Sequence, residues 1–181
     1  ALISESSQFA FGANLAWQTY LIDTLGGPAA YYSAIPNYGE LQKNTVTGRG
    51  SMGETVFTYG GNYNNRFYIA ATLGIANIRY LQESNYQESV SSDDSTTTLS
   101  SFTLTENLTT KGTGYNFKLG IIYRVHDYIR LGAAIHSPTF FNLHDQWSSK
   151  MESNFEDGSH YEYSSPQGEY DYLLTTPFRA I

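Results

Sequence analysis

The segment that decides the fold class is Gly114-Tyr-Asn-Phe-Lys-Leu-Gly-Ile-Ile-Tyr-Arg124. Its odd-numbered positions are all apolar or aromatic, whereas its even-numbered positions are mostly polar or small. Successive side chains of a β-strand point to opposite faces of a sheet, so this alternation predicts a strand with one apolar and one polar face. After a short connection the alternation resumes in Ile129-Arg-Leu-Gly-Ala-Ala-Ile-His136. The two runs together predict a β-hairpin.

The same alternation predicts four more strands. One pair covers about Glu54–Tyr63 and Arg66–Asn77 and forms a second hairpin. An earlier strand is expected from about Gln8 to Ile22, and a last one begins near Tyr170. The predicted fold is therefore all-β, an antiparallel up-and-down meander of about six strands.

The length of these runs favours a membrane barrel over a soluble sandwich. Strands of soluble proteins average about five or six residues, whereas a strand tilted by about 45° needs roughly 9–11 residues to cross a bilayer. The predicted strands reach the second length. The chain is also rich in interface-favouring aromatic residues, with 16 Tyr and 10 Phe, and only 15% of its residues are charged. No apolar run is long enough to predict a membrane-spanning helix.

The connections alternate between short and long. We expect tight turns near 62–65 and 125–128, and long polar loops near 23–49, 82–105 and 137–169. Short turns at one end and long loops at the other are typical of outer-membrane barrels, whose turns are periplasmic and whose loops are extracellular. Bacterial barrels of this kind have at least eight strands. The whole chain, 1–181, is therefore predicted to be an internal fragment of a larger transmembrane β-barrel.

Several segments resemble one family of outer-membrane proteins. They are Gly50–Glu54, Gly60–Ile75, Lys118–Arg124, Leu131–Thr139 and Leu173–Arg179, and they are similar to the FadL/TodX transporters of hydrophobic compounds. The resemblance implies a 14-stranded barrel with an N-terminal hatch, and passive uptake of long-chain fatty acids or similar molecules. The Asn-Pro-Ala hatch motif of the family does not occur in this sequence. No ligand-contacting residue of the family corresponds to a numbered position here.

Charge and composition argue against other classes of function. The net charge is −7 and no Lys/Arg cluster occurs, so a nucleic-acid partner is not expected. The absence of cysteine excludes disulfides and thiolate metal sites. His136-Ser137 has no partner acid of the right strand phase, and His144-Asp145 and His160-Tyr-Glu162 lie in predicted loops without metal-ligand spacing. We therefore expect no enzyme activity, no catalytic or metal site and no cofactor.

The polar face of the strands supplies the candidate site. Our hypothesis is that some of its residues line the lumen and tune the passage of a carboxylate. The alternative is that they form ion pairs and hydrogen bonds with one another, as charges inside a filled barrel must. The candidates are Asn14, Gln18, Asn116, Lys118, Arg124, Arg130 and His136.

The function predicted from the sequence is passive uptake of hydrophobic small molecules across the cell outer membrane. The expected partners are outer-membrane lipid, lipopolysaccharide and the hydrophobic ligand. A second hypothesis is a structural or surface-interaction barrel whose long loops bind a partner or a glycan. A third, a soluble lipid-binding β-barrel, requires the apolar face to point inward and leaves the segregation of the long loops unexplained. The sequence specifies neither the ligand nor the oligomeric state.

Overall fold

The structure is a computed structural model that describes residues 12–24, 31–35, 40–90 and 97–181. Most of the described residues form antiparallel β-strands, which confirms the all-β fold class. None of the described helices is long and apolar enough to cross a membrane. In chain order the elements are α1 (Ala13–Gln18), β1 (Ile22–Thr24), β2 (Tyr31–Ser33), β3 (Leu41–Tyr63), β4 (Phe67–Ser89), β5 (Leu99–His126), β6 (Ile129–His136), β7 (Phe140–Phe155), β8 (His160–Ser164), β9 (Gly168–Thr175) and β10 (Arg179–Ala180).

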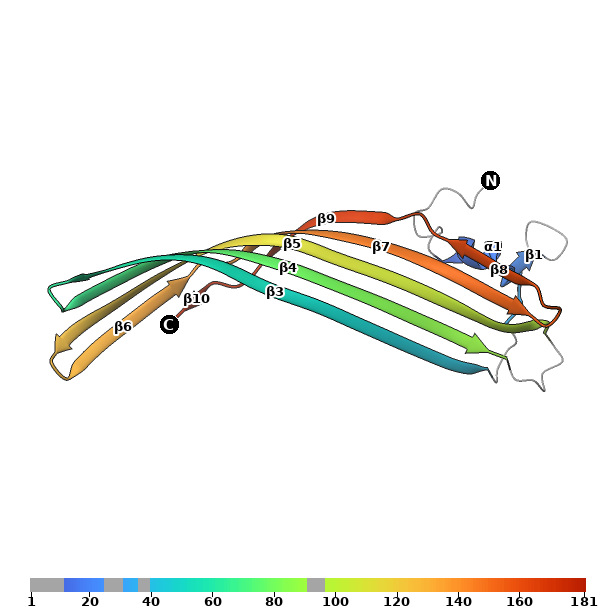
Figure 1. Ribbon diagram of the computed structural model, residues 1–181, viewed down its shortest axis with the longest axis horizontal. Coiled ribbons are helices and arrows are strands. Elements are labelled where there is room, and N and C mark those ends of the chain that lie inside the picture. Colours follow the sequence, from blue (N-terminus) through green and yellow to red (C-terminus); the bar gives the residue numbers. More distant parts are fainter. Residues whose placement is uncertain (1–11, 25–30, 36–39, 91–96) are drawn as a thin grey trace. The chain divides into compact units, whose positions relative to one another are not determined.

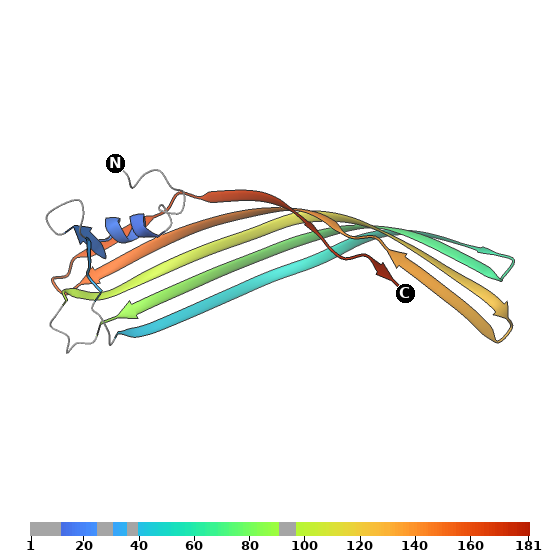
Figure 2. The ribbon, with the colours of Figure 1, turned by 180° about the vertical axis from the view of Figure 1, so that it is seen from behind.

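Eight strands form one sheet in which β3, β4 and β5 are neighbours in sequence order (Figure 1). β5 pairs with both β6 and β7; β8 and β9 pair with β7, and β10 pairs with β6. The view from behind shows the same order of β3, β4 and β5 (Figure 2). The sheet is not closed, because β3 pairs only with β4 in the part of the chain that the structure describes.

The chain divides into two compact units, and the long strands contribute residues to both. The first unit comprises Ala1–Arg49, Leu81–Thr109 and Gln146–Glu169. The second unit comprises Gly50–Tyr80, Thr110–Asp145 and Tyr170–Ile181.

In the second unit the pairing of β5 with β6 keeps the two faces separate. Leu119 lies opposite Ile135 and Tyr123 lies opposite Leu131, so apolar residues face apolar residues across the pair. Lys118 lies opposite His136 on the other face. We call the first face the apolar face and the second the polar face. Large exposed side chains of the apolar face are Phe57, Tyr59, Tyr63, Phe67, Ile69, Leu73, Tyr115, Phe117, Ile121, Tyr123, Ile129, Leu131 and Ile135.

Both hairpins of the second unit have tight turns. In the first, Asn64 and Asn65 have φ values of 55° and 52°, and the Arg66 N–H donates to the Tyr63 carbonyl at 3.1 Å. Two consecutive residues with positive φ form the turn whose twist matches that of the flanking strands, and asparagine tolerates this conformation better than most residues. The second turn lies at Asp127 and Tyr128.

Glycines of β5 allow a small buried cluster to form on the polar face of the second unit. Ala76, Phe141 and Leu143 are its buried members, and Ile78 and Tyr172 pack against them. A Cβ at position 114 would lie 2.5 Å from the Phe141 ring, and one at position 112 would lie 2.3 Å from the Leu143 side chain. The two β7 side chains therefore lie directly on the β5 backbone.

The first unit has a core of its own beneath α1. Leu15, Leu21, Leu99, Phe102 and Met151 form a buried cluster. The α1 segment contacts β8 (Figure 2), and the Ser153 hydroxyl donates to the Thr19 carbonyl at 2.6 Å.

The strand predicted over Gln8–Ile22 is wrong for its described part. Residues 13–18 form α1, and a short strand begins only at Ile22. Leu15 is fully buried in the cluster of the first unit, so tertiary packing decides the conformation here rather than the alternating pattern. Residues 8–11 lie outside the described part of the chain.

The connections expected at 82–105 and 137–169 are largely strand. β4 continues to Ser89 and β5 begins at Leu99, and β7 and β8 occupy most of the second stretch. Likewise, β3 begins at Leu41, inside the loop expected over 23–49. Outside β7 these segments are rich in Ser, Thr, Asn and Glu, so no apolar alternation marks them. In β7 one strand phase contains Phe141, Leu143, Trp147, Met151 and Phe155, an alternation that sequence reasoning missed.

The contact between Gly114 and Phe141 gives a first prediction. Gly114→Val should destabilise the complete protein by about 1–3 kcal/mol, because the added side chain overlaps a buried ring. The measurement is urea unfolding in neutral detergent micelles. The matched control is Gly53→Val, since nothing lies within 4 Å of a Cβ at position 53. Equal stability of the two variants would contradict the packing described here.

Candidate functional site

A polar cluster on β3, β5 and the start of β7 is the best-defined group of functional side chains in the second unit. The Asn116 amide donates to Glu54 Oε1 at 2.7 Å and to Thr139 Oγ1 at 3.3 Å. Lys118 Nζ lies 3.0 Å from both carboxylate oxygens of Glu54. One carboxylate thus accepts hydrogen bonds from two neighbouring positions of the same face of β5.

Gly74 makes this cluster possible. β4 lies between β3 and β5 in the sheet, so the Glu54 side chain has to pass over β4 to reach Asn116. A Cβ at position 74 would lie 2.2 Å from Glu54 Oε1 and 2.6 Å from Asn116 Oδ1. A side chain at position 74 would therefore force the carboxylate and the amide to move.

The charges of this cluster are neutralised within it. Glu54 and Lys118 form an ion pair, and their side chains are only 31% and 30% exposed. Asn116 is 8% exposed, and its Oδ1 atom is buried without a hydrogen-bond partner among the described residues. That oxygen can accept a hydrogen bond from a water molecule or a ligand.

A second group of charges lies at the β5–β6 turn. Arg124 lies opposite Arg130, and like charges that face each other across a strand pair are unfavourable. Arg124 Nη2 donates to Asp127 Oδ1 at 2.9 Å, which compensates one of the two positive charges. The Asp127 side chain is 78% exposed, so this ion pair is a solvated one.

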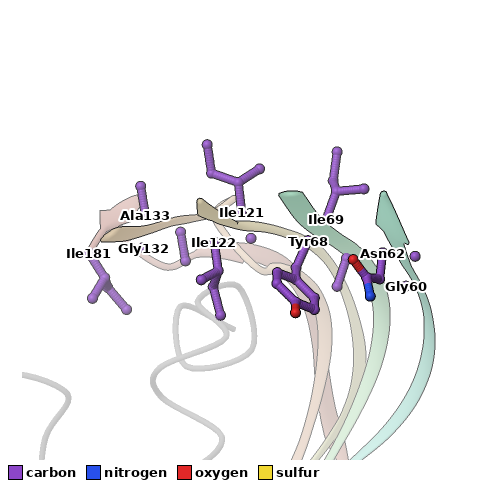
Figure 3. Close-up of a pocket in the computed structure, with 13 residues that line it drawn as sticks. Gly60, Asn62, Tyr68, Ile69, Ile121, Ile122, Gly132, Ala133 and Ile181 are labelled. Carbon is purple, nitrogen blue, oxygen red and sulfur yellow. The ribbon is translucent and has the colours of Figure 1, made fainter. Parts of the chain in front are cut away.

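An apolar groove of about 630 Å³ lies over β3–β6 in the second unit. Gly60, Gly120 and Gly132 line it and leave its space open. Figure 3 shows Tyr68, Ile122 and Ile181 on one side of the sheet, and Ile69, Ile121 and Ala133 on the other. Gly120 lies opposite Ala134 and is two residues from Lys118 along β5, so the groove adjoins the polar cluster.

The structure brings together part of the predicted site. Asn116 and Lys118 share the cluster with Glu54, and His136 lies opposite Lys118. Arg124 and Arg130 face each other at the turn. Asn14 and Gln18 do not belong to this face, because both lie on α1 in the first unit. Their assignment to a strand is wrong for the packing reason given above.

Sequence reasoning missed Glu54, Gly74 and Thr139. Glu54 shares the strand phase of Thr58 and Gly60, which marked it as a residue of the polar face. Pairing that acid with Lys118 required the strand order. The role of Gly74 carried no sequence signal, because it depends on the reach of a side chain from another strand.

His144 and His160 each contact one polar side chain of another strand. His144 and His160 were expected in loops but lie on β7 and β8. His144 Nδ1 is 2.7 Å from Asp171 Oδ1, and His160 Nδ1 is 2.9 Å from Asn154 Oδ1. Among the described residues no group of three or more His, Asp and Glu side chains could hold a metal ion.

The comparisons with protein-family models and with curated proteins found no match for this sequence. The resemblance to FadL/TodX transporters therefore stays a prediction.

The polar cluster gives a second prediction. A double-mutant cycle of Glu54→Gln and Lys118→Gln should show a coupling of about 0.5–1 kcal/mol at low salt, because the pair is partly shielded from water. The measurement is the free energy of unfolding in neutral micelles. A cycle on Arg124 and Asp127 is the matched control, with a coupling near zero expected.

The same cycle in a Gly74→Ala background tests the role of the glycine. A methyl group at position 74 displaces the Glu54 carboxylate, so the coupling should disappear. A coupling that survives Gly74→Ala would show that Glu54 does not need the space above β4.

Proposed function

We propose that this chain is part of an outer-membrane β-barrel of FadL/TodX type, through which hydrophobic small molecules such as long-chain fatty acids diffuse passively. The observation that carries the proposal is the exposed apolar face of the second unit. On β4 the outward positions from 67 through 77 include no charged residue, and neither do those from 113 through 123 on β5. Each stretch has eleven residues, which agrees with the roughly 9–11 that a tilted strand needs to cross a bilayer.

Aromatic residues at the tight turns support the same orientation. Tyr63, Tyr123 and Tyr128 are exposed at or beside the two turns. Tyrosine is favoured where a ring meets lipid and a hydroxyl meets the headgroup layer. The turn end of the second unit therefore suits a membrane boundary.

The polar face suits the passage of an amphipathic ligand. The apolar groove matches an alkyl chain, and the neighbouring cluster offers Lys118 and His136 near its end. The Lys118–Glu54 pair keeps this positive charge balanced, which favours transient contact with a carboxylate over tight binding.

Further strands are part of the proposal. Among the described residues β3 pairs only with β4, and open edges within a bilayer leave backbone groups without hydrogen-bond partners. In the proposed barrel, strands outside this chain pair with that edge.

One observation favours the second hypothesis, a surface-interaction barrel. β4 has 23 residues, about twice the number that crosses a bilayer, and the part beyond Arg79 is polar. This polar part of β4 offers a surface for a partner or a glycan.

The lipid-facing assignment gives a third prediction. This chain contains no cysteine. Single cysteines placed from 115 through 123 in the complete protein, with any cysteine outside this chain replaced by serine, should alternate in reactivity. In intact outer membranes, odd positions should react with a lipid-dissolved maleimide and even positions with a water-soluble one, because side chains alternate between the two faces. Reaction of both sets from water would remove the membrane assignment.

The groove gives a fourth prediction, which separates transport from a purely structural barrel. Gly132→Phe places a ring in the groove beside Ile122 and should slow uptake of a long-chain fatty acid severalfold. Ala133→Phe is the matched control, because its side chain points to the opposite face (Figure 3) and should leave uptake unchanged. The measurement is the initial uptake rate in cells with equal amounts of each variant. Equal rates for the two variants would favour the structural alternative.

A further inference from the structure

Two positive side chains lie next to each other at the end of the apolar face that is remote from the turns. Thr113 Oγ1 is 3.1 Å from Asn77 Oδ1, and Gly74 lies against Asn116. Both contacts fix the same register between β4 and β5. Two residues further along, that register places Arg79 of β4 opposite Lys111 of β5, on the same face as Asn77 and Thr113.

Neither of these positive charges is neutralised. Arg79 and Lys111 are exposed, and neither forms an ion pair with another residue in the described part of the chain. Like charges directly opposite each other in an antiparallel pair are destabilising. Lys118, by contrast, is paired with Glu54.

The two bases line a groove that contains further hydrogen-bonding side chains. Its volume is about 570 Å³, and Thr113, Asn142 and His144 line it together with Arg79 and Lys111. Asp171 is the acidic residue of the groove, and its Oδ1 atom lies 2.7 Å from His144 Nδ1. The groove therefore presents two unpaired cations, the neutral side chains of Thr113 and Asn142, and the Asp171 carboxylate beside His144.

The position of the groove selects the kind of anion. Along β4 the apolar stretch ends at Asn77 and Arg79 follows, so a ligand in the groove would stand at the border of the apolar face. In a membrane, that border is the layer of lipid headgroups. Phosphate is the anion of such headgroups, and arginine and lysine are its usual binding residues.

We propose that Arg79 and Lys111 form a binding site for the phosphate group of a membrane lipid, with Asn142 and Thr113 as neutral hydrogen-bonding partners. The site rests on the proposed function, because only a lipid-facing apolar surface brings lipid headgroups to Arg79 and Lys111. With the tight turns on the periplasmic side, Arg79 and Lys111 lie at the outer leaflet. The expected occupant is therefore a phosphorylated glycolipid of the lipid A type. Its acyl chains would cover the apolar face, and its phosphate would relieve the repulsion between the two bases.

The test uses native mass spectrometry of the complete protein in neutral detergent, with lipid A as the probe. Arg79→Gln and Lys111→Gln should each lower the affinity for lipid A about tenfold, as expected for loss of one charge-assisted contact. Asp171→Asn should raise the affinity, because it removes the negative charge of the groove. Lys43→Gln is the matched control, a loss of one positive charge on β3 in the first unit, and should change nothing.

Two further probes identify the source of the phosphate. Lipid A without its phosphates should bind much more weakly, and inorganic phosphate at equal concentration should not displace intact lipid A. Equal binding of the dephosphorylated lipid, or displacement by inorganic phosphate, would overturn the lipid-phosphate site. So would unchanged binding by the Arg79 and Lys111 variants.

Thermal unfolding with and without lipid A separates a loss of lipid binding from a loss of folding in the variants. Without lipid, the Lys111→Gln protein should be as stable as the wild type or more stable, because a repulsion is removed. With lipid A, the wild type should gain more stability than the variant, since only a bound ligand shifts the unfolding equilibrium. A variant that loses stability without lipid would assign Lys111 a structural role and overturn the proposal. Cysteine labelling of positions 115 through 123 shows separately whether the apolar face meets lipid, so failure of this site and failure of the proposed function are distinguishable.

Discussion

The register between neighbouring strands of the second unit is the constraint on which the other features depend. A shift of one residue between β5 and β6 would move Lys118 and Arg124 to the apolar face and Leu119 and Ile121 to the polar one. The turns at 64–66 and 127–128 are short, and short turns limit the registers that each hairpin can adopt. Both the exposed apolar face and the polar cluster follow from this pairing.

Small residues on the polar face then decide what each part of that face can do. Where a glycine faces a long side chain of another strand, the side chain fills the space, as Glu54 does above Gly74 and Phe141 does above Gly114. Where small residues meet, as Gly120 and Ala134 do, the space stays open and becomes the groove. The same residue type thus yields an ion-paired cluster, a buried apolar contact and an open apolar groove, depending on its neighbours.

The sequence predicted the second unit far better than the first. Alternation from Gly114 to His136 is strong because one face of that hairpin is wholly apolar, and the structure has the strands there. In β4 beyond Arg79 both faces are rich in polar residues, so the period-two signal vanishes although the strand continues. Around Leu15 the pattern predicted a strand where the structure has a helix, because a short apolar alternation fits a strand and a buried helical turn equally well. Asn116, Lys118 and His136 could be placed on one face from strand phase alone. Glu54 has the phase of the polar face too, but its pairing with Lys118 could not be predicted, because the order of strands in the sheet is a property of the whole chain.

The charged residues of the second unit differ in whether another residue of the described chain neutralises them. On the polar face, a carboxylate reaches across an intervening strand to pair with Lys118, at the expense of a glycine on that strand. The two side chains are only 30% and 31% exposed, and an unpaired charge in such a partly enclosed site would destabilise the fold. On the apolar face, Arg79 and Lys111 stand opposite each other with no acid of the described chain between them. In the proposed lipid site, the phosphate of a membrane headgroup balances the repulsion between these two bases.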